Sequence, residues 1–165
     1  MNARRPPGLI LAAAVGGGLA VMVSGCAWFG DAFPRYTDVT ITASEQANPD
    51  DSGRPSPVAL KVYELKRRDT FDNLDFDAAF DNADVVLSDE LLASAEFMLQ
   101  PGESVTHRID LDDDGAYVGV VAAYRQIDDA RWRLVNPVEG NWSEQNVRVG
   151  RTGLALERRA DEDDA

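Results

Sequence analysis

The chain contains a single histidine, His107, whose imidazole is the natural candidate for a general base near neutral pH. A Ser-His-Asp or Cys-His mechanism would have to use it. His107 alternates with Val105 and Ile109 on the apolar face of a predicted strand, and Arg108 follows it. The sequence also lacks the G-x-S-x-G motif of a nucleophile elbow. This pattern favours a structural or partly exposed histidine, and we predict that the protein is not an enzyme and needs no cofactor.

A run of alternating carboxylates follows the histidine. Asp110, Asp112, Asp114 and Gly115 match the opening D-x-D-x-D-G of a calcium loop, in which three oxygens and a glycine turn surround the ion. The twelfth position of that motif is Val121 instead of a bidentate glutamate, and the flanking segments have the pattern of strands. We therefore predict a tight acidic turn and no metal site.

Four aromatic residues are candidates for a carbohydrate-binding face: Tyr117, Tyr124, Trp132 and Trp142. Core packing is the simpler interpretation for aromatic residues at alternating strand positions. Trp142 is the exception, because it lies in a segment that has the composition of a loop. Ligand binding by such residues is the alternative function that the sequence leaves open.

The N-terminus has the composition of a secretion signal. Arg4 and Arg5 precede an apolar run over residues 9–23, which is shorter than the roughly 20 residues that span a membrane. Two small residues, Ser24 and Gly25, separate this run from Cys26, the only cysteine. We expect cleavage before Cys26 and attachment of a diacylglycerol to its thiol.

This arrangement resembles the lipobox of bacterial lipoproteins. A lone thiol has no disulfide partner in an exported chain, and two or three acyl chains give a stable membrane anchor. A lipidated Cys26 cannot act as a nucleophile. In such lipoproteins an aspartate after the cysteine favours retention in the inner membrane, and position 27 is Ala27. The resemblance therefore implies a palmitate-bearing protein on the periplasmic face of the outer membrane.

The charge balance excludes one class of partner. The chain has 29 acidic and 16 basic residues and a net charge of −13, and loss of Arg4 and Arg5 with the signal makes it two units more negative. Recognition of phosphates depends on lysine and arginine, so we predict no binding to nucleic acid.

Apolar and polar residues alternate along the segments that contain these residues, a period of two that is typical of half-buried strands. Seven or eight short strands separated by turns predict a mainly β fold, a two-sheet β-sandwich. The predicted strands centre on residues 39–43, 58–62, 95–99, 105–111, 116–124, 131–135, 146–149 and 153–157.

Two segments break the alternation. Between residues 70 and 93 the apolar side chains have helical spacing, with Ser88 placed to cap a second short helix, so we expect a small helical insertion. Residues 44–57 read SEQANPDDSGRPSP and have no apolar residue except Ala47, so they form a long loop.

These features divide the chain into four parts. Residues 1–25 are the signal peptide and residues 26–36 a lipidated tether. Residues 37–158 are the sandwich domain with its insertion at about 70–93, and residues 159–165 are an acidic tail that we expect to be disordered.

Several segments follow one another in a fixed order behind the lipobox. They are Asn48-Pro49, Ser52-Gly53-Arg54-Pro55-Ser56-Pro57, Phe71, residues 75–80, residues 87–92, Leu99-Gln100-Pro101-Gly102-Glu103, residues 117–125 and Trp132-Arg133. Their order resembles the TssJ family, the outer-membrane lipoproteins of the type VI secretion system. The resemblance covers most of the mature chain and depends on the motifs together rather than on any one of them.

The resemblance implies a transthyretin-like fold and a docking role without catalysis. In this family the lipid holds the protein under the outer membrane. The loop between the first two strands then binds the periplasmic domain of the large inner-membrane subunit, TssM. Carried over to this chain, that loop is residues 44–57, and its polar candidates for contact are Gln46, Asn48, Asp50, Asp51 and Arg54.

Overall fold

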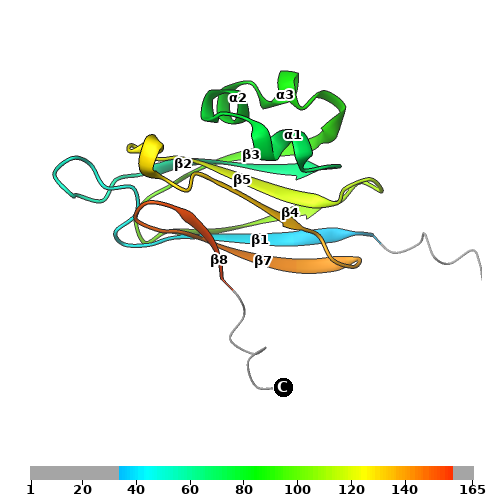
Figure 1. Ribbon diagram of the computed structural model, residues 1–165. Helices are drawn as coiled ribbons and strands as arrows, with labels where there is room; N and C mark the ends of the chain where they lie inside the picture. The colour runs from blue at the N-terminus through cyan, green and yellow to red at the C-terminus, as the bar shows by residue number, and fades with distance from the viewer. Residues whose placement is uncertain (1–33, 158–165) are drawn as a thin grey trace, which may run out of the picture. The chain divides into compact units, whose positions relative to one another are not determined.

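The computed structural model describes residues 34–157, which form two four-stranded sheets packed face to face (Figure 1). One sheet has the strand order β4-β1-β7-β8 and the other β3-β2-β5-β6. The predicted two-sheet sandwich is therefore confirmed. The strands are β1 (Tyr36–Ala43), β2 (Val58–Leu65), β3 (Leu91–Leu99), β4 (Ser104–Asp110), β5 (Tyr117–Ala123), β6 (Arg133–Pro137), β7 (Trp142–Val149) and β8 (Leu154–Glu157). The proposed signal peptide, Cys26 and residues 159–165 lie outside the described part.

Alternation along the sequence places the core between the sheets. In β1, Val39, Ile41 and Ala43 are buried, while the residues between them are half-buried. Val58, Leu60 and Val62 of β2 and Val118, Val120 and Ala122 of β5 face this layer from the other sheet. Removing this apolar surface from water is the main force that holds the sheets together.

The second half of β2 and the whole centre of β5 are buried on both faces, as the apolar run in β5 predicts. The reason is a helical layer on the outer face of the β3-β2-β5-β6 sheet (Figure 1). Phe71 from this layer packs on Tyr63 and on Gly119, where a β-carbon would lie only 2.9 Å from the ring. The layer consists of α1 (Asp69–Asn73), α2 (Phe76–Asp81), α3 (Ala83–Val86) and the 3₁₀ turn η1 (Ser88–Glu90).

Two local predictions were wrong. Ser88 does not cap a second α-helix: it begins the three-residue turn η1 with a φ of 49° and no capping hydrogen bond. The chain extends from Leu91 because that residue already pairs with Leu65 in the sheet. Trp142 is not in a loop either, since it begins β7 beside Tyr36 of β1.

The two ends of the sandwich carry different connections. Strand β1 begins at Tyr36, next to Asp110 at the end of β4, and finishes at Ala43, where residues 44–57 begin. Eight residues of strand span roughly 25 Å. The acidic turn after Asp110 and the long loop therefore lie at opposite ends, and Figure 1 shows the loop, in cyan, extending beyond the strands. We call these ends the tether end and the loop end.

Candidate docking loop

The segment of residues 44–57 connects the two sheets at the loop end. Strand β1, before it, belongs to one sheet and strand β2, after it, to the other, so the loop must cross the thickness of the sandwich. Packed sheets are about 10 Å apart, which explains why the loop is longer than a hairpin turn. Its base is also part of the core, since Ala47 is fully buried between the sheets.

Asn48 fixes the path of the loop. Its side chain is 2 % exposed, and its Nδ2 donates a hydrogen bond of 2.6 Å to the carbonyl oxygen of Pro57. Its Oδ1 accepts one of 2.7 Å from the backbone N–H of Arg125, just beyond β5. The φ of Asn48 is 48°, a left-handed conformation that asparagine tolerates better than most residues. Asn48 therefore links both sides of the loop to the neighbouring sheet.

Asp50 organises the tip. Its Oδ1 accepts hydrogen bonds from the backbone N–H groups of Ser52 and Arg54, at 2.9 and 3.0 Å. Its Oδ2 lies 2.7 Å from the guanidinium of Arg54. The backbone and side-chain hydrogen bonds from Arg54 hold the pKa of Asp50 below its ordinary value. Gly53 closes the tip with a φ of 79°. The tip is thus internally braced before any partner arrives.

The structure distributes the five predicted contact residues unequally. Gln46, Asp51 and Arg54 are exposed, and the Arg54 side chain is 80 % exposed in spite of its pairing with Asp50. Asp50 is half-buried and Asn48 is buried within the protein itself. Three of the five side chains can therefore touch another molecule directly, while Asn48 and Asp50 set the shape in which the others are presented.

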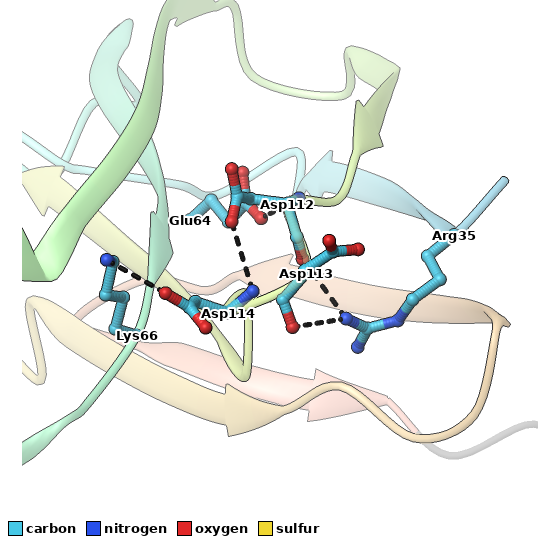
Figure 2. Close-up of polar contacts among 6 residues, drawn as sticks. All are labelled: Arg35, Glu64, Lys66, Asp112, Asp113 and Asp114. Atoms are coloured by element: carbon cyan, nitrogen blue, oxygen red, sulfur yellow. Dashed lines mark hydrogen bonds and ion pairs between the residues drawn. The ribbon is translucent and has the colours of Figure 1, made fainter. Parts of the chain in front are cut away.

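The opposite end carries the acidic turn, residues 112–115, which Figure 2 shows. Arg35 donates from Nη1 to the carbonyl oxygens of Asp112 and Asp113, at 3.1 and 3.0 Å, and from Nη2 to that of Gly115 at 3.1 Å. Lys66 lies 3.0 Å from the Asp114 carboxylate. Arg35 therefore holds the backbone of the calcium-like turn, and within the described residues Lys66 pairs with one of its carboxylates.

Glu64 lies beneath this turn. It is 2 % exposed, and its Oε1 accepts a 2.7 Å hydrogen bond from the backbone N–H of Asp112. Burial raises the pKa of Glu64 above its ordinary value, although the Asp112 N–H works against the increase. Within residues 34–157 no three potential metal ligands come together.

The remaining candidates for chemistry have structural surroundings. The His107 ring packs 5.3 Å from that of Phe97, and within the described residues no hydrogen bond joins it to a serine or a carboxylate. Tyr124 is buried and Trp132 packs edge-on against Phe76, as core packing predicts. Trp142 is 68 % exposed and borders a hollow of about 780 Å³. Among the residues of the described part, Trp142 is the only exposed aromatic side chain, so no row of exposed aromatics is found there.

Comparison with known proteins decides the family. The family model described as "Type VI secretion lipoprotein, VasD, EvfM, TssJ" matches residues 35–152 of this chain. The chain belongs to this TssJ family of type VI secretion lipoproteins. The membership agrees with the motifs and their order in the sequence.

Solved structures of TssJ proteins share the fold. The crystal structure of the T6SS lipoprotein TssJ1 from Pseudomonas aeruginosa is 33 % identical, with a TM-score of 0.73 over 76 % of this chain and 97 % of that one. Serratia marcescens Lip, described as a membrane-bound component of the type VI secretion system, is 26 % identical, with a TM-score of 0.73 over 78 % and 99 %.

A third match comes from a structure described as the T6SS protein TssM C-terminal domain from EAEC. The matching chain is 27 % identical, with a TM-score of 0.64 over 76 % of this chain and 99 % of that one. The comparison with curated proteins found no match. Within residues 34–157 no helix is long and apolar enough to cross a membrane.

Proposed function

We propose that this TssJ family member anchors the trans-envelope complex of a type VI secretion system to the outer membrane. In this proposal residues 44–57 bind the periplasmic domain of the large, TssM-type subunit of the inner membrane. The observation that carries the proposal is the loop itself. It extends beyond the strands and its base is fixed by Asn48. Gln46 is exposed at the start of the loop, and Asp51 and Arg54 are exposed at its tip.

The internal bracing suits a binding element. A flexible loop loses conformational entropy when it binds, whereas one already held in shape loses less and binds more tightly through the same contacts. The hydrogen bonds of Asp50 and the prolines on either side of the tip restrict this loop in the unbound protein. A loop that only joined two sheets would not need an ordered tip.

The position of the loop also fits a bridging role. The N-terminal segment that follows Cys26 enters the fold at Tyr36, at the tether end, whereas the loop lies at the other end of β1. A lipid on Cys26 would attach the protein to the membrane through residues that do not take part in docking. The TssM-containing description of one similar structure supports TssM as the class of partner.

The lipid anchor and the outer membrane are parts of the same proposal. They depend on Cys26 behind a short apolar run and on Ala27 after it. Replacing Cys26 with serine should abolish incorporation of radiolabelled palmitate and release the protein from membranes, because an alcohol does not substitute for the thiol. Undiminished labelling of the Cys26→Ser protein would contradict the lipoprotein assignment.

A second candidate function is binding of a carbohydrate or another small ligand beside Trp142. It is favoured by the exposed indole, by the adjacent hollow and by the buried Oε1 of Gln145, which lines the hollow and has no hydrogen-bond partner. Such a site should bind soluble glycan fragments in calorimetry, and Trp142→Ala should abolish that heat.

Co-purification tests the docking proposal. The mature chain without its lipid, residues 27–165, should retain the periplasmic domain of the TssM-type subunit from the same cell on an affinity column. Neither activity nor a cofactor is expected of the complex. Failure to retain that domain at micromolar concentration would refute the proposed function.

A further inference from the structure

The arginines of residues 34–157 fall into two groups. Seven of the ten engage a carboxylate or a backbone carbonyl through their side chains: Arg35, Arg54, Arg67, Arg68, Arg108, Arg133 and Arg148. The other three are exposed, and no hydrogen bond or ion pair of their side chains exists within the described residues. They are Arg125, Arg131 and Arg151, which we call the arginine trio.

All three members of the trio lie at the loop end. Arg125 is the residue whose N–H bonds to Asn48. Arg151 lies in the turn between β7 and β8, and its guanidinium is close to the loop tip. A β-carbon added to Gly53 of the tip would lie 3.7 Å from Nη2 of Arg151. Arg131 exchanges backbone hydrogen bonds with Thr152 and Leu154 on that same turn, at 3.0 and 2.9 Å. The trio thus lies on two connections at the loop end: Arg125 and Arg151 are next to the docking loop, and Arg131 is hydrogen-bonded to the turn that carries Arg151.

Unpaired guanidinium groups are unexpected in so acidic a protein, with 29 acidic residues to 16 basic ones. Carboxylates are present at this end, including Asp51, Asp128 and Asp129, but in the described part of the chain none forms an ion pair with a trio side chain. The guanidinium fork matches a carboxylate with two parallel hydrogen bonds, and desolvation at an interface strengthens them.

From this we infer that the arginine trio receives a short carboxylate-bearing segment of the docking partner. A hollow of about 460 Å³ between the loop and the β7–β8 turn offers space for it beside Arg151. Glu45, Gln46 and Arg148 also border this hollow, whereas Arg125 and Arg131 do not. A chain with a net charge of −13 repels a partner that is strongly acidic overall. The segment therefore carries a few carboxylates on a partner that is not strongly acidic as a whole. This inference rests on the proposed docking function and specifies the chemistry of its partner.

The test measures affinity for the TssM-type periplasmic domain, with the mature lipoprotein in detergent. The first variant reverses the charge of two trio members, Arg125→Glu with Arg151→Glu. It should bind at least about tenfold more weakly at low salt. The loss of affinity should be smaller in about 0.5 M salt, because salt screens the attraction between the arginines and the carboxylates. A control makes the same charge change at the tether end, Arg67→Glu with Arg68→Glu. This change breaks the ion pairs with Glu90 and Asp72 and so lowers stability, but the folded variant should bind within about twofold of wild type. Melting temperatures show that each variant is folded.

The outcomes separate this inference from the proposed function. The role of the arginines is overturned if the trio variant binds with wild-type affinity, or if it loses the same affinity at every ionic strength. In that case the docking function still stands if a variant with a shortened loop tip fails to bind. Wild-type protein that does not bind the domain refutes the docking function and the trio together. A parallel Arg125→Gln, Arg151→Gln variant should show a smaller loss than the charge reversal.

Discussion

The docking loop and the acidic turn are both polar connections, yet the fold treats them in opposite ways. In the turn, residues 112–115, Arg35 satisfies three carbonyl oxygens and Lys66 pairs with a carboxylate. In the loop, the internal hydrogen bonds hold the backbone, while Gln46, Asp51 and Arg54 point to solvent. Exposure does not separate the two segments, because Asp112, Asp113 and Asp114 are exposed as well. The turn is held by cationic side chains from elsewhere in the chain, whereas the tip of the loop is held by its own Asp50 and Arg54.

The largest effect on folding should come from Asn48→Ala. The substitution leaves the Pro57 carbonyl and the Arg125 N–H, which are both partly buried, without their partner, and it puts alanine at a positive φ. We expect a loss of about 2–4 kcal/mol in the free energy of unfolding, measured by urea denaturation, together with weaker partner binding.

Two control substitutions at this position separate the contribution of the backbone conformation from that of the hydrogen bonds. Asn48→Gly keeps the backbone conformation and should recover roughly 1 kcal/mol relative to alanine. Asn48→Asp retains the acceptor for Arg125 N–H but loses the donor to Pro57. If Asn48→Ala has wild-type stability and affinity, Asn48 does not hold the loop.

A smaller effect is expected at the tether end from Arg35→Ala. The variant loses three hydrogen bonds to the turn, of which two are exposed, so the free energy of unfolding should fall by about 1 kcal/mol. Partner binding should not change, because the turn lies at the far end of β1 from the loop. Weaker binding by a folded Arg35→Ala protein would show that the two ends are not functionally separate.

The pH dependence of stability gives the third and smallest effect. Because the folded state raises the pKa of Glu64, the protonated carboxyl favours folding, and this contribution is present at pH below about 4.5 and is lost as pH rises through the folded pKa. Glu64→Gln keeps an acceptor for the Asp112 N–H but has no proton to lose. Its stability relative to wild type should therefore increase between pH 4.5 and 7 in urea titrations.

An exposed glutamate provides the control for that titration. Glu139→Gln should run parallel to wild type across the same pH range, since Glu139 is exposed. A Glu64→Gln curve that is also parallel to wild type would mean that Glu64 does not titrate differently in the folded protein.

Much of the fold could be predicted because its signals are local. Strand β1 alternates because its apolar residues face the core on one side, and β5 is a continuous apolar run because both of its faces are buried. The parallel pairing of β1 with β7 left no such signal, since it joins residues about a hundred positions apart, as in the Thr37 contact with Ser143. Ser88 was mistaken for a cap because sheet pairing at Leu91 overrode the local helical preference.

The candidate site also combines features that are local in the sequence with features that depend on distant residues. The composition of residues 44–57 predicts a loop, but the role of Asn48 depends on Arg125, 77 positions away. The arginine trio was missed for the same reason, because its members come from two connections that meet only in the folded chain. The anchoring of Ala47 in the core was also not predictable from a segment that is otherwise polar.

The central claim is that the tip of the loop binds the TssM-type domain, and calorimetry on a shortened tip tests it most directly. Ser56 N–H bonds to the Ala47 carbonyl oxygen at 3.2 Å, so residues 49–55 can be replaced by Asn-Gly without moving the base of the loop. This variant should keep the wild-type circular dichroism spectrum and lose measurable binding, while Arg35→Ala binds normally. A folded tip-shortened protein that binds with wild-type affinity would contradict the account.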